Sequence, residues 1–163
     1  MDDPILNKLP IATNSVASLI SLTEYFAAAI GFFDMYITPG DTTNLLELFV
    51  FKYTVVCLIK ICTLYLTPFE KPKQLISYRD PIVELLGQTK KAFERDLFFS
   101  GHIAFLCLLI FMNHNQIILY IKLGCLITEV VSILLSRVHY TIDIFISPFI
   151  AYTVSNLVDK ICL

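Results

Sequence analysis

Residues 97–158 read, in succession, LFFSGHIAFLCLLIFM, NHN, QIILYIKLGCLITEVVSILL, SRVHY and TIDIFISPFIAYTVSNLV, and this stretch decides the fold. Three apolar runs alternate with two short polar turns. Crossing the hydrocarbon core of a bilayer takes about 20 apolar residues, so each run predicts a membrane helix, of which the first is the shortest. Two more apolar runs precede them. We therefore predict an all-α polytopic membrane helix bundle with about five transmembrane helices, at Ile11–Ile37, Leu45–Leu66, Leu97–Met112, Gln116–Leu135 and Thr141–Val158.

The composition agrees with this fold class and excludes several others. Of the 163 residues, 56% are hydrophobic and only 16% are charged, and the mean hydropathy is +0.73. About a quarter of the residues in a soluble domain are charged. The net charge of −2 offers no basic surface to a nucleic acid. The length predicts a single membrane domain over residues 1–163, and leaves the oligomeric state open.

The sequence predicts no metal ion and no other cofactor. Its five cysteines form no CxxC pair, and all lie in or beside apolar runs, as small buried hydrophobic residues do. No acidic cluster offers the several oxygen ligands that a magnesium site needs.

Ionisable residues occur within the predicted spans. Asn14, Ser18, Ser21 and Glu24 follow one another at helical spacing and form a polar stripe. A carboxylate facing lipid is costly, so we expect Glu24 to point into the bundle and to pair with Lys52. Glu129 has Arg137 as its candidate partner. If these intramembrane charges were the functional groups, the chain would be a small transporter or a packing subunit, not an enzyme.

One connection, residues 67–96, is long and polar. Its second half, Ile82–Phe93, combines apolar positions with Lys90 and Lys91, a pattern typical of a helix lying in the membrane interface. Such a helix could cover a site and guide lipid into it. The alternative is a plain amphipathic connector.

Two of the three histidines lie at predicted helix starts. His139 and Asp143 are four residues apart and so share one face of a helix. A carboxylate there can accept a proton from one imidazole nitrogen, which leaves the other nitrogen free to attack phosphorus. In Ser100-Gly101-His102, the serine can cap a helix whose first amides form a phosphate cradle. His102 could then protonate a leaving alkoxide.

The topology brings these two motifs to the same membrane face. Spans that alternate in direction put the starts of the third and fifth helices at one end of the bundle, so His102 and His139 can meet there. Basic residues around this end would place it in the cytoplasm by the positive-inside rule. A phosphate site attracts cations for its own reasons, however, so the orientation stays open.

Asp96-x3-Ser100-Gly101-His102 followed by His139-Tyr140-Thr141-Ile142-Asp143 resembles the two catalytic motifs of the sphingomyelin synthase family, within the type 2 phosphatidic acid phosphatase superfamily. The resemblance implies a catalytic triad of His102, His139 and Asp143, within residues 96–143, and transfer of a phospho-headgroup between lipids through a phosphohistidine. It also implies an active face in the periplasm or lumen. The phosphate-binding arginines of the phosphatase branch have no residues at matching spacing in this chain.

We therefore predict a lipid phosphotransferase of the sphingomyelin synthase-like type, with membrane lipids as substrates. With water as the acceptor, the same site would make the chain a lipid phosphate phosphatase. Beyond the triad, we expect substrate or phosphate contacts from residues within the motifs and from two nearby arginines. These are Ser100, Gly101, Asp96, Tyr140, Arg79 and Arg137.

Overall fold

A computed structural model describes residues 3–11, 14–40, 42–66 and 98–162 of the chain. The described residues form helices and no strands, which confirms the predicted all-α class. In chain order the elements are a 3-10 helix η1 (Leu6–Lys8), α1 (Asn14–Ile37), α2 (Thr42–Leu66), α5 (Gly101–Phe111), α6 (Gln116–Ser136) and α7 (Thr141–Cys162). The predicted interfacial helix at Ile82–Phe93 lies outside the described residues.

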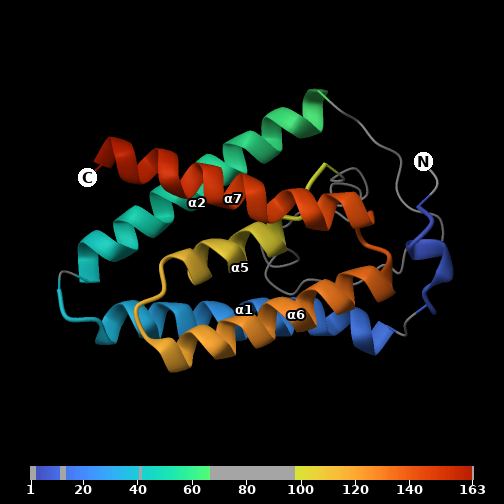
Figure 1. The fold of residues 1–163 in the computed structure, drawn as a ribbon, viewed down its shortest axis with the longest axis horizontal. Coiled ribbons are helices and arrows are strands. Elements are labelled where there is room, and N and C mark those ends of the chain that lie inside the picture. Colours follow the sequence, from blue (N-terminus) through green and yellow to red (C-terminus); the bar gives the residue numbers. More distant parts are fainter. Residues whose placement is uncertain (1–2, 12–13, 41, 67–97, 163) are drawn as a thin grey trace, which may run out of the picture.

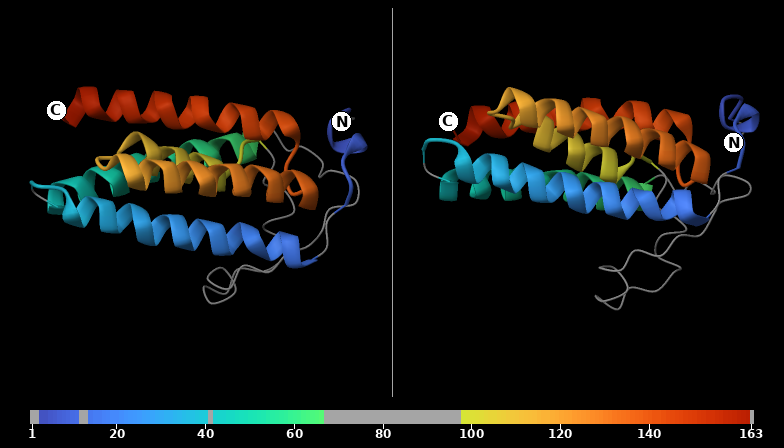
Figure 2. Two further views of the ribbon diagram at one scale, coloured as in Figure 1. Left: turned by 60° about the horizontal axis from the view of Figure 1, so that its bottom comes forward. Right: turned by 90° about the horizontal axis from the view of Figure 1, so that it is seen from below.

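The shortest of these α-helices, α5, forms the centre of the bundle. Figure 1 shows α1 and α6 side by side on one side of α5, with α2 and α7 crossing on the other, and the views of Figure 2 agree. Seven consecutive α5 residues, Ile103–Leu109, are buried. A helix that is apolar on every side either lies in a protein core or faces lipid, and the buried side chains of α5 show that it lies in the core.

The helices alternate in direction along the bundle, as predicted. The starts of α1, α5 and α7 and the ends of α2 and α6 gather at one end, beside the N-terminal segment (Figure 1). The α5–α6 turn and the C-terminus lie at the other end. The two histidine motifs, at the starts of α5 and α7, thus share one end of the molecule.

Three of the helices are long and apolar enough to cross a membrane: Val16–Ile37 in α1, Gln116–Ser136 and Thr141–Cys162. The helix α5, by contrast, has 11 residues, or about 16 Å at 1.5 Å per residue, and is too short to cross a hydrocarbon core of about 30 Å by itself. The prediction that this helix begins at Leu97 is wrong, because Ser100 caps it and Gly101 is its first residue.

The predicted pairing of Glu24 with Lys52 is also wrong. The Lys52 ammonium instead lies 2.7 Å from Asp159 Oδ1 and donates to Ser155 Oγ at 3.0 Å, which joins α2 to α7. Near the C-terminal end of α1, Asp34 Oδ2 lies 2.7 Å from Lys122 Nζ of α6, and both side chains are buried. In these two pairs the charges are neutralised between helices.

The second predicted pairing, of Glu129 with Arg137, does not form either. The Arg137 guanidinium donates to the carbonyl oxygens of Leu6 and Leu9, at 3.1 and 3.3 Å. Glu129 is fully buried, and neither of its carboxylate oxygens has a hydrogen bond within the described part of the chain.

Candidate active site

His139 and Asp143 form a buried pair at the start of α7. The helix begins at Thr141, so His139 lies in the turn before it, and the prediction that both residues share one face of a helix is wrong. His139 Nδ1 lies 3.5 Å from Asp143 Oδ2, and each residue is 3% exposed. The backbone N–H of Tyr140 donates to the same carboxylate oxygen at 3.0 Å and so fixes its position. At 3.5 Å the two atoms are slightly too far apart for a hydrogen bond, and a small movement of either side chain would form one. The carboxylate favours the tautomer with its proton on Nδ1, which leaves the lone pair on Nε2.

The first turn of α5 begins at the Ser-Gly-His motif. Ser100 Oγ accepts the backbone N–H of Ile103 at 3.4 Å and caps the helix. The first amides of a helix have no acceptor within it, and together with the helix dipole they attract anions. This helix start therefore suits a phosphate group.

A lysine that the sequence analysis did not assign to the site lies at the same helix start. A side-chain carbon added at Gly101 would come within 2.7 Å of Lys60 Nζ, so the ammonium lies directly against this glycine. The same ammonium is 5.8 Å from the centre of the Phe99 ring. Lys60 comes from the C-terminal part of α2, and it places a positive charge beside the amides that begin α5.

Ser147 joins the two motifs. The backbone N–H of Ser100 donates to Ser147 Oγ at 2.8 Å, and that hydroxyl donates to the backbone carbonyl of Asp143 at 2.6 Å. All three residues are buried. The start of α5 is therefore held against the first two turns of α7 by a continuous pair of hydrogen bonds, which the sequence analysis did not identify.

His102 contacts the first helix of the bundle. Its Nε2 lies 3.5 Å from Glu24 Oε2, and the two side chains are 15% and 18% exposed. Glu24 does point into the bundle, as predicted, but its partner is this histidine. A carboxylate at this distance can orient the imidazole ring.

The N-terminal segment is fastened to the turn that carries His139. Asp3 accepts the backbone N–H of Thr141 at 2.8 Å and its hydroxyl at 3.2 Å, and so caps α7. Burial alone would raise the pKa of the Asp3 carboxyl. Hydrogen bonds from Thr141, Leu6 and Ile5 outweigh that effect and hold the pKa below its ordinary value of 3.8.

Arg137 forms the other half of this attachment. It ends α6 in the left-handed conformation, with φ of 55°, and its guanidinium donates to the Leu6 and Leu9 carbonyls. We predicted a phosphate contact for Arg137, whereas in the structure its guanidinium holds the N-terminal segment. Tyr140 contacts Asp143 through its backbone, as described above. Two other predicted contact residues, Asp96 and Arg79, lie outside the described residues.

Across the described ranges, no three His, Cys, Asp or Glu side chains cluster as ligands of a metal ion would. The arrangement instead combines two histidines, each beside a carboxylate, with a helix start and a lysine. These groups can bind a phosphate and move protons at its oxygens.

A comparison with protein-family models matches residues 95–161 to the PAP2 superfamily C-terminal domain. Both histidine motifs fall within the matched residues. No curated protein and no solved structure matches the chain significantly. Proteins of this superfamily are phosphatases and phosphotransferases that act on phosphate esters, which is consistent with an enzyme. The match does not distinguish the sphingomyelin synthase branch from the rest of the superfamily. With its three span-length helices and this match over residues 95–161, the chain is a membrane protein whose C-terminal part is similar to the type 2 phosphatidic acid phosphatase superfamily.

Proposed function

We propose that the chain is a multi-pass membrane enzyme that transfers a phospho-headgroup between lipids, in the manner of the sphingomyelin synthases. The observation that carries this proposal is the hydrogen-bonded link from Ser100 through Ser147 to Asp143. It holds a helix start suited to phosphate against the turn that presents a nucleophilic histidine. A purely structural pair of helix ends would not require a charge-paired histidine in each.

In the first step, His139 Nε2 attacks the phosphorus of a lipid phosphate ester. The phosphorus–oxygen bond to the departing group breaks as the phosphorus–nitrogen bond forms. Asp143 stabilises the positive charge that develops on the imidazole, because it faces Nδ1. His102 gives its proton to the departing oxygen. Since Nε2 of His102 faces Glu24, Nδ1 is the nitrogen that would face this oxygen.

In the second step, an acceptor hydroxyl attacks the phosphohistidine. His102 now takes the proton of that hydroxyl, the phosphorus–nitrogen bond breaks, and His139 returns to its starting state. The amides at the start of α5 and the Lys60 ammonium would bind the charged phosphate oxygens in both steps. Because no step needs a metal ion, this chemistry fits the residues described above.

The acceptor separates two candidate functions. The burial of His139 and Asp143 favours a lipid hydroxyl, because a water-poor site protects the phosphohistidine from hydrolysis. The family match extends to the whole superfamily and equally suits water, which would make the chain a lipid phosphate phosphatase.

The test is a product analysis with the purified protein in detergent micelles. Phosphatidylcholine, phosphatidylethanolamine and phosphatidate are offered separately, each with and without ceramide or diacylglycerol. We expect a new phospholipid that forms only when the acceptor lipid is present. Release of free phosphate without a new lipid would assign the phosphatase function, and no product from any mixture would reject both.

The dependence on the site is tested with matched histidine variants. Replacing a catalytic nucleophile lowers the rate by at least about 10³-fold, so H139A should abolish product formation. The control is H114A, because His114 lies in the exposed α5–α6 turn at the far end of the bundle. Equal activity of H139A and the unaltered protein would overturn the assignment of the nucleophile.

A further inference from the structure

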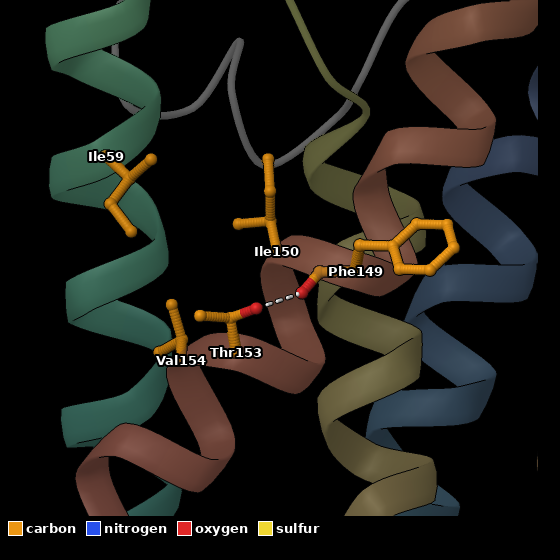
Figure 3. Close-up of a pocket in the computed structure, with 5 residues that line it drawn as sticks. All are labelled: Ile59, Phe149, Ile150, Thr153 and Val154. Carbon is orange, nitrogen blue, oxygen red and sulfur yellow. Dashed lines mark hydrogen bonds between the residues drawn. The ribbon is translucent and has the colours of Figure 1, made fainter.

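An apolar groove lies between α2 and α7, on the outer surface of the bundle. It has a volume of about 220 Å³ and is lined by Ile59 of α2 and by Phe149, Ile150, Thr153 and Val154 of α7 (Figure 3). The only hydroxyl among these side chains, that of Thr153, donates to the Phe149 carbonyl of its own helix at 2.8 Å. The groove therefore offers hydrocarbon to an occupant and almost no hydrogen-bonding group.

Both walls of the groove belong to helices that also carry residues of the candidate active site. On the α2 wall, Ile59 precedes Lys60, whose ammonium lies against Gly101. On the α7 wall, Asp143, Ser147, Ile150 and Val154 are spaced by four, three and four residues, so they form one stripe on that helix. Ser147 holds the Ser-Gly-His turn, and Ile150 follows it by less than one helical turn.

The groove also opens toward the membrane. Phe149 is 72% exposed on α7, which is one of the helices long and apolar enough to span the bilayer. Pockets that enclose whole small-molecule ligands measure about 300–1,000 Å³, so this groove is too small for a whole lipid. Its apolar lining suits part of one extended chain and not a charged headgroup.

We propose that this groove holds one acyl chain of the phosphorylated lipid whose phosphate occupies the start of α5. This proposal rests on the proposed function and specifies its substrate as a lipid with a long chain attached near the phosphate. Asp143 and Ile150 are separated by seven residues, or about 10 Å along α7 at 1.5 Å per residue. A chain must therefore extend well beyond its first few carbons before it reaches the groove.

The surrounding bilayer is as apolar as the groove, so burial in the groove contributes little affinity. Its effect is to direct the chain and thereby to orient the phosphate ester for attack. Correct orientation of reacting groups contributes strongly to the rates of enzymes. Blocking the groove should therefore lower the reaction rate with long-chain substrates and leave unchanged the rate with esters whose chains are too short to reach the groove.

The experiment fills the groove from either wall, with I150W on α7 and I59W on α2. Each variant is assayed for phosphate transfer or release with dioleoyl phosphatidate and with dibutyryl phosphatidate, whose chains are too short to reach the groove. We expect kcat/KM for the dioleoyl lipid to fall at least tenfold in both variants, and kcat/KM for the dibutyryl lipid to stay within twofold. The control is I127W, at a 65% exposed position of α6 outside the groove, which should change neither value.

Equal losses with both lipids, or no loss with either, would overturn the groove as a chain site. A second measurement does not depend on turnover. Phosphatidate with a diazirine near the end of one acyl chain is photolysed on the unaltered protein, and the labelled peptides are identified by mass spectrometry. We expect labelling at Phe149–Val154 and around Ile59 that excess dioleoyl phosphatidate suppresses. Uniform labelling of all lipid-facing helices would contradict the chain site, whereas groove labelling in a protein without turnover would reject only the proposed function.

Discussion

Glu24 is the residue through which the first helix contacts the candidate active site. Its carboxylate lies 3.5 Å from His102 Nε2, so a small movement of either side chain would form a hydrogen bond. If this contact keeps His102 protonated and oriented, Glu24 acts on the chemical step and not on substrate binding. Its position was predictable from the polar stripe on α1, but its partner was not, because sequence spacing does not report which helix lies opposite.

We therefore expect E24Q to lower kcat by about tenfold or more while KM changes little, because the amide keeps the shape of the side chain and loses its charge. Steady-state kinetics on the lipid substrate identified in the product analysis measures both constants. The matched control is E47Q, at an exposed position of α2. A change confined to KM would show that Glu24 supports binding instead.

Asp3 is a cap that no local pattern could have revealed. It lies 138 residues from Thr141 in sequence, yet it accepts two hydrogen bonds at the start of α7. We expect D3A to lower the free energy of unfolding by about 0.5–2 kcal/mol, the usual cost of losing a cap. Thermal unfolding followed by circular dichroism in detergent measures this loss as a lower Tm. T141V, which keeps the backbone amide and loses only the hydroxyl, should lose less.

The effect of Asp3 also has a defined pH dependence. Its folded-state pKa lies below the ordinary value of 3.8, so the native state favours the carboxylate. The stabilisation is complete above that ordinary value and disappears as the pH falls through the lower native pKa. The Tm difference between the unaltered protein and D3A should therefore be constant near pH 7 and shrink below about pH 4. A difference that stays the same down to pH 2 would contradict the cap.

At the scale of whole elements, buried ion pairs set which helix faces meet. Lys122 on α6 contacts Asp34 on α1 at 2.7 Å and donates to the Leu109 carbonyl of α5 at 3.0 Å, so one ammonium joins three helices. Asp34 Oδ2 also accepts the backbone N–H of His114 in the α5–α6 turn, at 3.2 Å. This network closes the end of the bundle opposite the candidate active site.

Removing one member of this pair leaves an uncompensated buried charge. We expect K122M alone to destabilise the protein by about 3–5 kcal/mol, and the double variant D34N/K122M to recover much of that loss, because it leaves no buried charge. Thermal unfolding of the two single variants and the double variant in one detergent gives the coupling energy. Additive losses would show that the two side chains act independently.

The sequence predicted helices better than it predicted their partners. Apolar runs located α6 and α7 to within a few residues, because their length and composition follow directly from the bilayer. The start of α5 was misplaced by four residues. The apolar run in the sequence already begins at Leu97, whereas the helix begins only after its N-terminal cap, Ser100. The predicted pairings of Glu24 with Lys52 and of Glu129 with Arg137 failed because a charged side chain in a bundle has several possible neighbours at similar depth.

The candidate site was predictable only in part, because spacing along the chain identifies residues that are close in sequence but not contacts between helices. Alternating helices had to bring both motifs to one end. The spacing of His139 and Asp143 predicted that they lie close together, although the turn before α7 and not a shared helix face brings them together. Ser147 follows Asp143 by another four residues, so the same spacing could have identified it. Lys60 reaches Gly101 from a different helix, and only the packing of α2 against α5 reveals this contact.

For the molecule as a whole, the fold predicts that its two ends lie on opposite sides of the membrane. Lys8 in η1 is exposed at the active-site end, and His114 is exposed at the other end. In sealed vesicles of one orientation, a membrane-impermeant maleimide should label K8C or H114C, but not both, until the vesicles are opened. Mass spectrometry separates these sites from the natural cysteines. Labelling of both sites in sealed vesicles would contradict a bundle that spans the bilayer.

All of the chemistry proposed for the molecule passes through one covalent state of His139. The purified protein is mixed briefly with phosphatidate carrying a radioactive phosphate, quenched in alkali, which preserves phosphohistidine, and digested for mass spectrometry. We predict a phosphate on His139 that is absent from H139A and that disappears when an acceptor lipid or water is given time to react. Turnover without any phosphorylated histidine, or a phosphate carried by another residue, would contradict the proposed site.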